Sequence, residues 1–260
     1  MKVREVIDAI KQNLGVPFPE RSTRDTLKTG DPEMEVKGIA TTMMATFDML
    51  KRANAAGLNM IITHEDLWWN DRDETKDLLD NPLYKKKLDF INQNKLAIFR
   101  NHDSTHAMKV DVTVTGTLRS IGVKGGENAS MRPGILPIPE MTLGEFASQA
   151  KRLSGFREIR CVGDPKAKVS KVLDGPGYAT PRFTLDTDVV IGGESQEADG
   201  GFDNVEYVAD ATSLGMNKGL VMLGHVVSEQ NGHEDYAKWL QTFIKGIPIQ
   251  FVAAEEPFWG

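Results

Sequence analysis

Short apolar runs alternate with stretches of helical periodicity along most of the chain. At the start, apolar residues recur every three or four positions, which is typical of one face of an amphipathic helix. Further on, brief uninterrupted apolar runs between turn residues indicate buried strands. The pattern predicts helices over 1–14, 47–56, 83–94, 142–154, 205–214 and 233–244. It predicts strands over 36–40, 58–63, 95–100, 167–177, 186–193, 218–224 and 247–253. Strands that alternate with helices favour an α/β protein whose strands are largely parallel and buried.

One stretch interrupts this alternation. Residues 125–139 are rich in Gly and Pro, which favour turns and loops over helices and strands. We therefore predict a boundary there, with an N-terminal lobe over 1–124 and a C-terminal lobe over 125–260. The length of 260 residues is compatible with two such lobes. The sequence has no internal repeat and no heptad pattern. No phosphate-binding glycine motif follows a predicted strand.

Composition narrows the classes of function. The chain has 37 acidic and 31 basic residues, and its net charge of −6 argues against nucleic acid as a partner. The lone cysteine, Cys161, allows neither an internal disulfide nor a cysteine-based zinc site. Charged residues run through the first fourteen positions, and no apolar run approaches the ~18 residues that span a bilayer. We expect a cytoplasmic protein with no membrane partner.

Histidine and acidic side chains cluster just after four of the predicted strands. They are His64, Glu65 and Asp66 after strand 58–63, His102 and His106 after 95–100, Glu194 after 186–193, and His225 and Glu229 after 218–224. Ligand sites in open α/β sheets lie outside the carboxyl ends of the strands. If these strands are parallel neighbours, four of the five histidines converge with several carboxylates.

This mixture of residue types indicates a divalent metal site. Neutral imidazole and carboxylate together suit Zn, Mn, Fe, Co or Ni, and four His with two Glu suffice for two ions with room for water. Taken alone, each cluster is equally compatible with an ordinary turn or surface helix, but the joint pattern favours a metal site. Glu194 is a candidate catalytic acid or base, although plain exposure remains open for it. We expect the fifth histidine, His233, to be exposed on a polar helix.

At these residues the chain resembles the Nif-three-like family of dinuclear-metal proteins, which carry the name GTP cyclohydrolase I type 2 homologues. The family's first block is a strand ending in Thr-His-His-Pro, matched here by Thr63-His64-Glu65-Asp66. Its second block, His-x-x-x-Asp, corresponds to His102 through His106. Its third block, Gly-His-x-x-x-Glu, is matched in full by Gly224 through Glu229, and the tail Pro257-Phe258-Trp259 is similar too.

The resemblance implies two divalent metal ions held by His64, Glu65, His102, His106, His225 and Glu229. Glu65 stands where the family has His, and His106 stands where it has Asp, so the two changes exchange a histidine and a carboxylate between blocks. Our hypothesis is a rearranged site whose bridging carboxylate comes from Glu65. The resemblance also implies a two-lobed fold of mostly parallel buried strands, a metal site in the cleft to which residues 218–260 return ligands, and a homo-oligomer, a hexamer in bacterial relatives.

Two classes of function remain. One is a metal-dependent hydrolase in which a metal-bridged hydroxide attacks a small, unknown substrate. The family name suggests a nucleotide such as GTP, but the sequence has no guanine-reading or phosphate-cradling motif. The alternative is a non-catalytic metal-binding scaffold or regulator that acts through protein partners. A plain α/β protein without metal is the third possibility.

Overall fold

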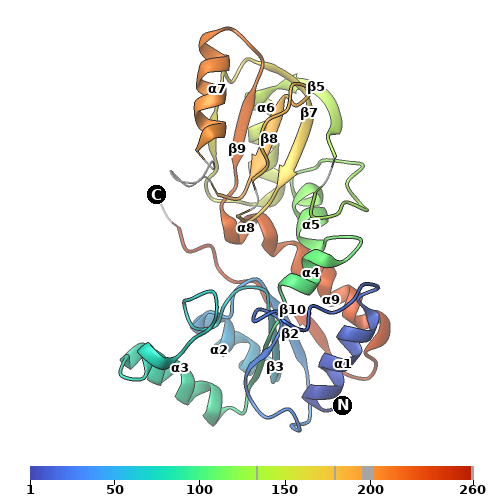
Figure 1. Ribbon diagram of the computed structural model, residues 1–260, viewed down its shortest axis with the longest axis vertical. Coiled ribbons are helices and arrows are strands. Elements are labelled where there is room, and N and C mark those ends of the chain that lie inside the picture. Colours follow the sequence, from blue (N-terminus) through green and yellow to red (C-terminus); the bar gives the residue numbers. More distant parts are fainter. Residues whose placement is uncertain (133, 179, 195–201, 259–260) are drawn as a thin grey trace. The chain divides into compact units, whose positions relative to one another are not determined.

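The structure is a computed structural model that describes residues 1–260 except 133, 179, 195–201 and 259–260. Trp259 of the family-like tail therefore lies outside the described residues. The chain divides into two compact units (Figure 1). Unit 1 comprises Met1–Met108 and His233–Glu255, and unit 2 comprises Lys109–Gly232 and Glu256–Gly260.

Unit 1 is built on a five-stranded sheet. In spatial order its strands are β1 (Leu27–Thr29), β4 (Ala97–Arg100), β3 (Met60–Thr63), β2 (Ile39–Thr42) and β10 (Ile249–Phe251). The last four are mutually parallel, whereas β1 pairs antiparallel with β4. Every residue of β2, β3 and β4 is buried, as in parallel sheets covered on both faces. This is why the sequence shows uninterrupted apolar runs there.

Helices cover both sides of this sheet (Figure 1). Those of unit 1 are α1 (Val3–Asn13), α2 (Phe47–Ala55), α3 (Pro82–Gln93), the short α4 (Asp103–Ala107) and α9 (Gly232–Phe243), with a 3-10 turn η1 (Lys76–Leu78). The predicted helical periodicity of α1 is confirmed, because its apolar stripe is buried at Val3, Val6 and Ile10. Helices α2 and α3 pack on one face through Met49, Leu50 and Ile91.

Unit 2 has its own five-stranded sheet. Its spatial order is β5 (Leu136–Thr142), β7 (Lys168–Gly175), β8 (Val189–Gly192), β9 (Gly219–Met222) and β6 (Arg160–Val162). The three central strands are parallel and the two edge strands are antiparallel to them. The helices are α5 (Val112–Ser120), α6 (Leu143–Ser154), α7 (Asp203–Ser213) and α8 (His225–Gln230).

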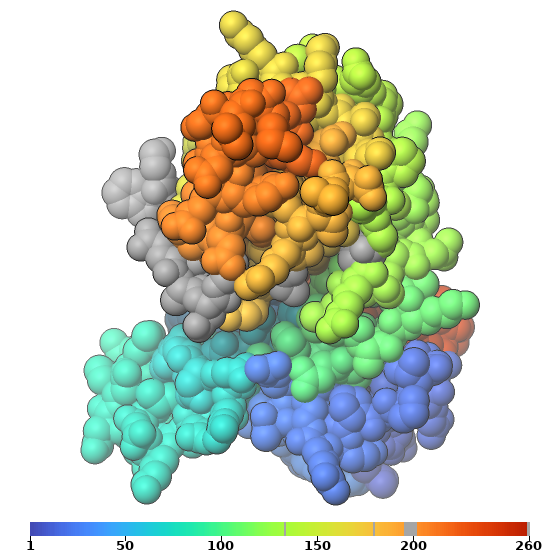
Figure 2. Space-filling view, turned by 45° about the horizontal axis from the view of Figure 1, so that its top comes forward, coloured from blue at the N-terminus to red at the C-terminus, as the bar shows by residue number. Residues whose placement is uncertain are grey.

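The two faces of this second sheet are covered by different helices. Val114 of α5, Phe146 of α6 and Val227 of α8 share one core cluster with the strands. Val208 of α7 packs with Leu220 of β9 on the other face. Helix α7 lies at the surface of unit 2, in orange at the front of Figure 2. The predicted capping box of α6 is confirmed, with Thr142 as its N-cap.

The predicted boundary at 125 differs from the division in the structure, which falls at Met108. The reason is that α5 buries Val114 and Leu118 in the core of unit 2. Part of the Gly/Pro-rich stretch is also not a linker, because Leu136–Thr142 forms edge strand β5. Prolines, which lack an N–H group, are tolerated on an edge strand.

After unit 2, the stretch His233–Glu255 returns to unit 1. Strand β10 pairs in parallel with β2, with Ile249 opposite Ile39. The pattern of the sequence predicts a strand over 247–253 but not its sheet, because a short apolar run carries no information about its neighbouring strand. Within the part of the chain that the structure describes, no helix is both long enough and apolar enough to cross a membrane.

Candidate metal centre

Three of the predicted ligands lie together in unit 1. His64 directly follows β3, His102 is the N-cap of α4, and His106 lies on α4. The His64 ring stacks on that of His102 at 4.3 Å between centroids and meets the His106 ring edge-on at 4.9 Å. One nitrogen of each ring lies within 4.8 Å of the others. Because β3 and β4 are parallel neighbours with Thr63 opposite Arg100, their carboxyl ends coincide and their following residues meet.

Glu65 lies at the margin of this histidine cluster. Its Oε1 is 3.9 Å from Nε2 of His102, and its Oε2 is 3.1 Å from Nη2 of Arg100. The structure therefore places the carboxylate, as the sequence predicts, beside the histidines. It also gives the carboxylate a cationic neighbour that the sequence does not predict.

The ring of His102 is held in a state that suits metal binding. Its Nδ1 lies 2.9 Å from Oδ1 of Asp103, and Oδ2 of Asp103 accepts a hydrogen bond from Ser22 Oγ at 2.7 Å. A carboxylate on one ring nitrogen orients the ring and leaves the other nitrogen for a metal. Burial and the neighbouring His106 lower the pKa of His102, which favours the neutral imidazole that metals require.

The prediction for His233 is wrong. Its side chain is buried, with only 3% of the residue exposed, and its ring lies 5.1 Å from that of His64. The signal that could have revealed this is helical periodicity. Buried residues of α9 follow His233 at the spacing of one helix face, namely Tyr236, Ala237 and Leu240. His233 belongs to that face, so the packing of α9 on its own unit buries it.

A segment near the N-terminus supports the histidine cluster. The carboxylate of Asp25 accepts hydrogen bonds from the backbone N–H groups of His102, Asp103 and Ser104 at 3.0–3.1 Å. Arg24 pairs with Asp71 at 2.7 Å. Sequence reasoning does not find these residues, because they lie far from the histidines along the chain and follow no motif.

In unit 2 the structure brings together the remaining predicted site residues. His225 and Glu229 lie one turn apart on α8, with 3.4 Å between His225 Nε2 and Glu229 Oε2, so the predicted shared helix face is confirmed. Glu194, which follows β8, contacts His225 Nδ1 through Oε1. The carboxylate thus orients the His225 ring, and Nε2 faces Glu229.

A tight turn surrounds the Glu229 carboxylate. Gly177 has a left-handed φ of 60°, and its N–H donates to Ser228 Oγ at 2.9 Å. A Cβ atom at this position would lie 2.2 Å from Glu229 Oε1. The Gly-Pro-Gly turn that ends with this residue therefore leaves room for a ligand carboxylate.

Gly177→Ala should destabilise unit 2 by about 1–3 kcal/mol and weaken metal binding, because the new methyl collides with Glu229. Urea denaturation and metal titration measure the two effects. Gly155→Ala is the matched control, since Gly155 has a similar φ of 72° but open space where its Cβ would stand. If both variants bind metal as the unmodified protein does, the turn has no role in placing Glu229.

A buried acid lies near Glu229 in the same unit. Asp174 of β7 is only 2% exposed. Burial raises the pKa of Asp174 well above its usual range, and the negative charges of Asp111 and Glu229 raise it further. This shift favours the neutral form of Asp174, which would add no negative charge to that of Glu229.

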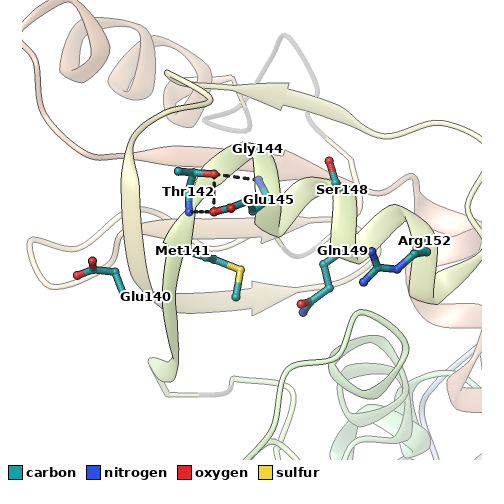
Figure 3. A pocket seen from close by; sticks show the side chains of 8 residues that line it. All are labelled: Glu140, Met141, Thr142, Gly144, Glu145, Ser148, Gln149 and Arg152. Carbon is teal, nitrogen blue, oxygen red and sulfur yellow. Dashed lines mark hydrogen bonds between the residues drawn. The ribbon is translucent and has the colours of Figure 1, made fainter.

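A pocket of about 780 Å³ lies between β5 and α6 in unit 2 (Figure 3). Among the described residues that line it, none is a predicted site residue, and Thr142 and Glu145 are engaged in the capping box of α6. Two of its lining residues thus cap the N-terminus of α6, and the described lining has no cluster of metal-ligating side chains.

Comparison with known proteins identifies the family. A family model described as Duf34/NIF3 (NGG1p interacting factor 3) matches residues 1–257. The chain belongs to the Duf34/NIF3 family. A relative from Clostridium acetobutylicum, named GTP cyclohydrolase 1 type 2 homolog, is 24% identical over 242 residues, which cover 88% of this chain and 85% of the relative.

Solved structures share the NIF3 fold. A Bacillus cereus protein related to NIF3 aligns with a TM-score of 0.74 and 15% identity, over 100% of this chain and 99% of that one. A Staphylococcus aureus protein aligns with a TM-score of 0.73 and 16% identity, over the same shares. These structures confirm the two-sheet α/β fold. In the described residues, groups of His and Glu side chains could bind a metal ion.

Proposed function

We propose that this NIF3-family protein is a metal-dependent hydrolase of a small substrate and that it binds two divalent ions. The observation that carries the proposal is the cluster of His64, His102 and His106, whose nitrogens lie within 4.8 Å of one another. Three imidazoles at this separation fit a borderline ion such as Zn, Mn, Fe, Co or Ni. The lowered pKa of His102 and the contact of its ring with Asp103 also suit a metal ligand.

The proposed ligands come from two sets. His64, Glu65, His102 and His106 in unit 1 supply one set, and His225 and Glu229 in unit 2 supply the other. We propose these six residues as the ligands of the two ions, because they stand at the positions that the family resemblance implies. Relative to the family pattern, Glu65 and His106 exchange a carboxylate and a histidine, so the total of four His and two carboxylates is kept.

The proposed hydrolysis needs an activated water molecule and an acid or base. Two bound ions would lower the pKa of a water molecule and stabilise an oxyanion. Glu194 is the proposed acid or base, and through its contact with His225 Nδ1 it also holds that ring in place. Support for a nucleotide as substrate comes only from the name of the relatives, GTP cyclohydrolase 1 type 2 homolog.

The first test is metal content. Untagged protein purified without chelator should contain about two divalent ions per chain by elemental analysis. His106→Ala and Glu229→Gln should each weaken metal affinity about tenfold or more. Glu234→Gln is the control, because among the described residues this exposed acid forms an ion pair with Lys238 at the surface, and its loss should leave metal content unchanged. Well under one ion per chain in the unmodified protein would refute the proposal.

The second test is turnover. Metal-loaded protein is screened against nucleotides including GTP, phosphoesters and cyclic amides. We expect one class to be hydrolysed, with the rate reduced about a hundredfold or more in Glu229→Gln. Metal binding without turnover of any class would favour a scaffold over a hydrolase. Turnover that is undiminished in Glu229→Gln would place the chemistry elsewhere.

A further inference from the structure

Arg100 is a fully buried arginine at the end of β4, two residues before His102. It is 0% exposed. Its guanidinium donates from Nε to the His64 carbonyl at 3.1 Å, from Nη1 to the Asp71 carbonyl at 2.5 Å and from Nη2 to Glu65 Oε2 at 3.1 Å. The same side chain therefore contacts two consecutive proposed ligands, the backbone of one and the carboxylate of the next.

These contacts give the two oxygens of Glu65 different surroundings. Oε2 faces a permanently charged guanidinium. Oε1 lies 3.9 Å from His102 Nε2. Ligand atoms that share one ion at about 2.0–2.2 Å each lie within about 4 Å of one another, so Oε1 and His102 can bind the same metal. A cation at Oε2 would instead stand beside the positive charge of Arg100.

We infer that Arg100 is a positioning residue that makes Glu65 a one-oxygen metal ligand. This inference rests on the proposed metal centre. It replaces the hypothesis that Glu65 supplies the bridging carboxylate, because Oε2 of Glu65 is bound by Arg100. The fork of the guanidinium is needed, since a lysine ammonium at the same place is a point charge and cannot hold both the His64 carbonyl and Glu65 in one geometry.

Other charges explain why the arginine is tolerated in the interior. Asp71 and Asp73 lie 3.4 Å and 3.5 Å from its nitrogens, and Lys28 pairs with Asp73 at 3.0 Å. Lys28 thus belongs to the same buried ion network, and none of its ion pairs in the described structure involves Glu65. It provides a matched control for any general loosening of the loop.

The experiment uses Co²⁺ as a probe in the full-length protein after removal of metal. Its visible absorption spectrum reports coordination, and competition with a chelator reports affinity. We expect Arg100→Lys to change the spectrum and weaken Co²⁺ binding about tenfold or more, as loss of a group that orients a ligand does. Lys28→Met should keep the spectrum and affinity of the unmodified protein. In a Glu65→Ala background, Arg100→Lys should have a much smaller effect, because only its contact with the His64 carbonyl is then left to lose.

Each contrary outcome has a distinct meaning. If the unmodified protein does not bind Co²⁺, the proposed metal centre fails, and this inference with it. If it binds Co²⁺ and Arg100→Lys leaves spectrum and affinity unchanged, only this inference fails. An equal effect of Arg100→Lys with and without Glu65 also overturns it. Should thermal unfolding show that Arg100→Lys does not fold, Glu65→Gln decides, because a glutamine with unchanged Co²⁺ affinity and spectrum contradicts a carboxylate shared between Arg100 and metal.

Discussion

Replacement of Asp25 by alanine should destabilise the protein by about 3–5 kcal/mol and weaken metal binding about tenfold or more. The carboxylate of Asp25 is 4% exposed and accepts hydrogen bonds from three successive backbone N–H groups, those of His102, Asp103 and Ser104. It also accepts one from Ser104 Oγ at 2.6 Å. Alanine leaves these buried donors unsatisfied, and each costs about 1–3 kcal/mol.

The effect on metal binding follows from where Asp25 binds, which is the start of α4. The three N–H groups begin α4, which carries His102 at its N-cap and His106 within it. Without the carboxylate, this short helix loses the contacts that fix its start, so both rings lose their orientation. Urea denaturation measures the stability, and metal titration measures the affinity.

Asp31→Ala is a matched control for this prediction. Asp31 lies in the same unit and accepts a backbone N–H from Glu33 at 2.8 Å, but it does so in an exposed turn. Water can satisfy that donor, so we expect a change of about 0.5 kcal/mol or less and unchanged metal affinity. Equal effects of the two substitutions would show that Asp25 does not organise α4.

The protein should become more stable as the pH rises from about 8 to about 10.5, and Lys87 should account for about 3 kcal/mol of this gain. Burial lowers the pKa of Lys87 from 10.5 to about 8, although Asp66 and Asp73 partly offset the effect. Its Nζ donates to the carbonyl of Leu67 at 2.7 Å and lies 5.6 Å from the Trp68 ring centre.

The direction follows from proton binding. Between these two pH values the unfolded chain keeps the proton on Lys87 while the folded chain releases it. The unfolded state then binds more protons, so the free energy of unfolding rises with pH. Below pH 8 both states carry the charge and Lys87 contributes no pH dependence. Urea denaturation of the unmodified protein and Lys87→Met, across this range, measures the difference.

Lys85→Met is the control for this second prediction. Lys85 lies on the same helix with 54% of its side chain exposed, near Asp80 at 3.5 Å. Its removal should shift stability by an amount that does not depend on pH in this window. A constant difference between the unmodified protein and Lys87→Met from pH 8 to 10.5 would contradict a buried ammonium.

Much of the fold follows from local patterns. The buried parallel strands are predictable because β2, β3 and β4 are apolar on both faces and read as continuous runs. Edge strands β1 and β6 are missed because each has three residues and lacks such a run. Strand β5 is missed because its prolines read as a linker. Each of these edges depends on a partner strand elsewhere in the chain.

The sequence by itself determined that histidines and acids directly follow the buried strands. Residues that follow neighbouring parallel strands lie at the same edge of the sheet, so this spacing was enough to predict that His64 and His102 lie close together. It also determined the shared helix face of His225 and Glu229, because four residues make about one turn. Only the tertiary structure decided how these groups are held. Asp25 reaches His102 across 77 residues, Arg100 reaches Glu65 across 35, and His233 is buried beside His64. A one-dimensional pattern records periodicity and spacing, whereas a hydrogen bond or ion pair between distant segments exists only once packing brings them together.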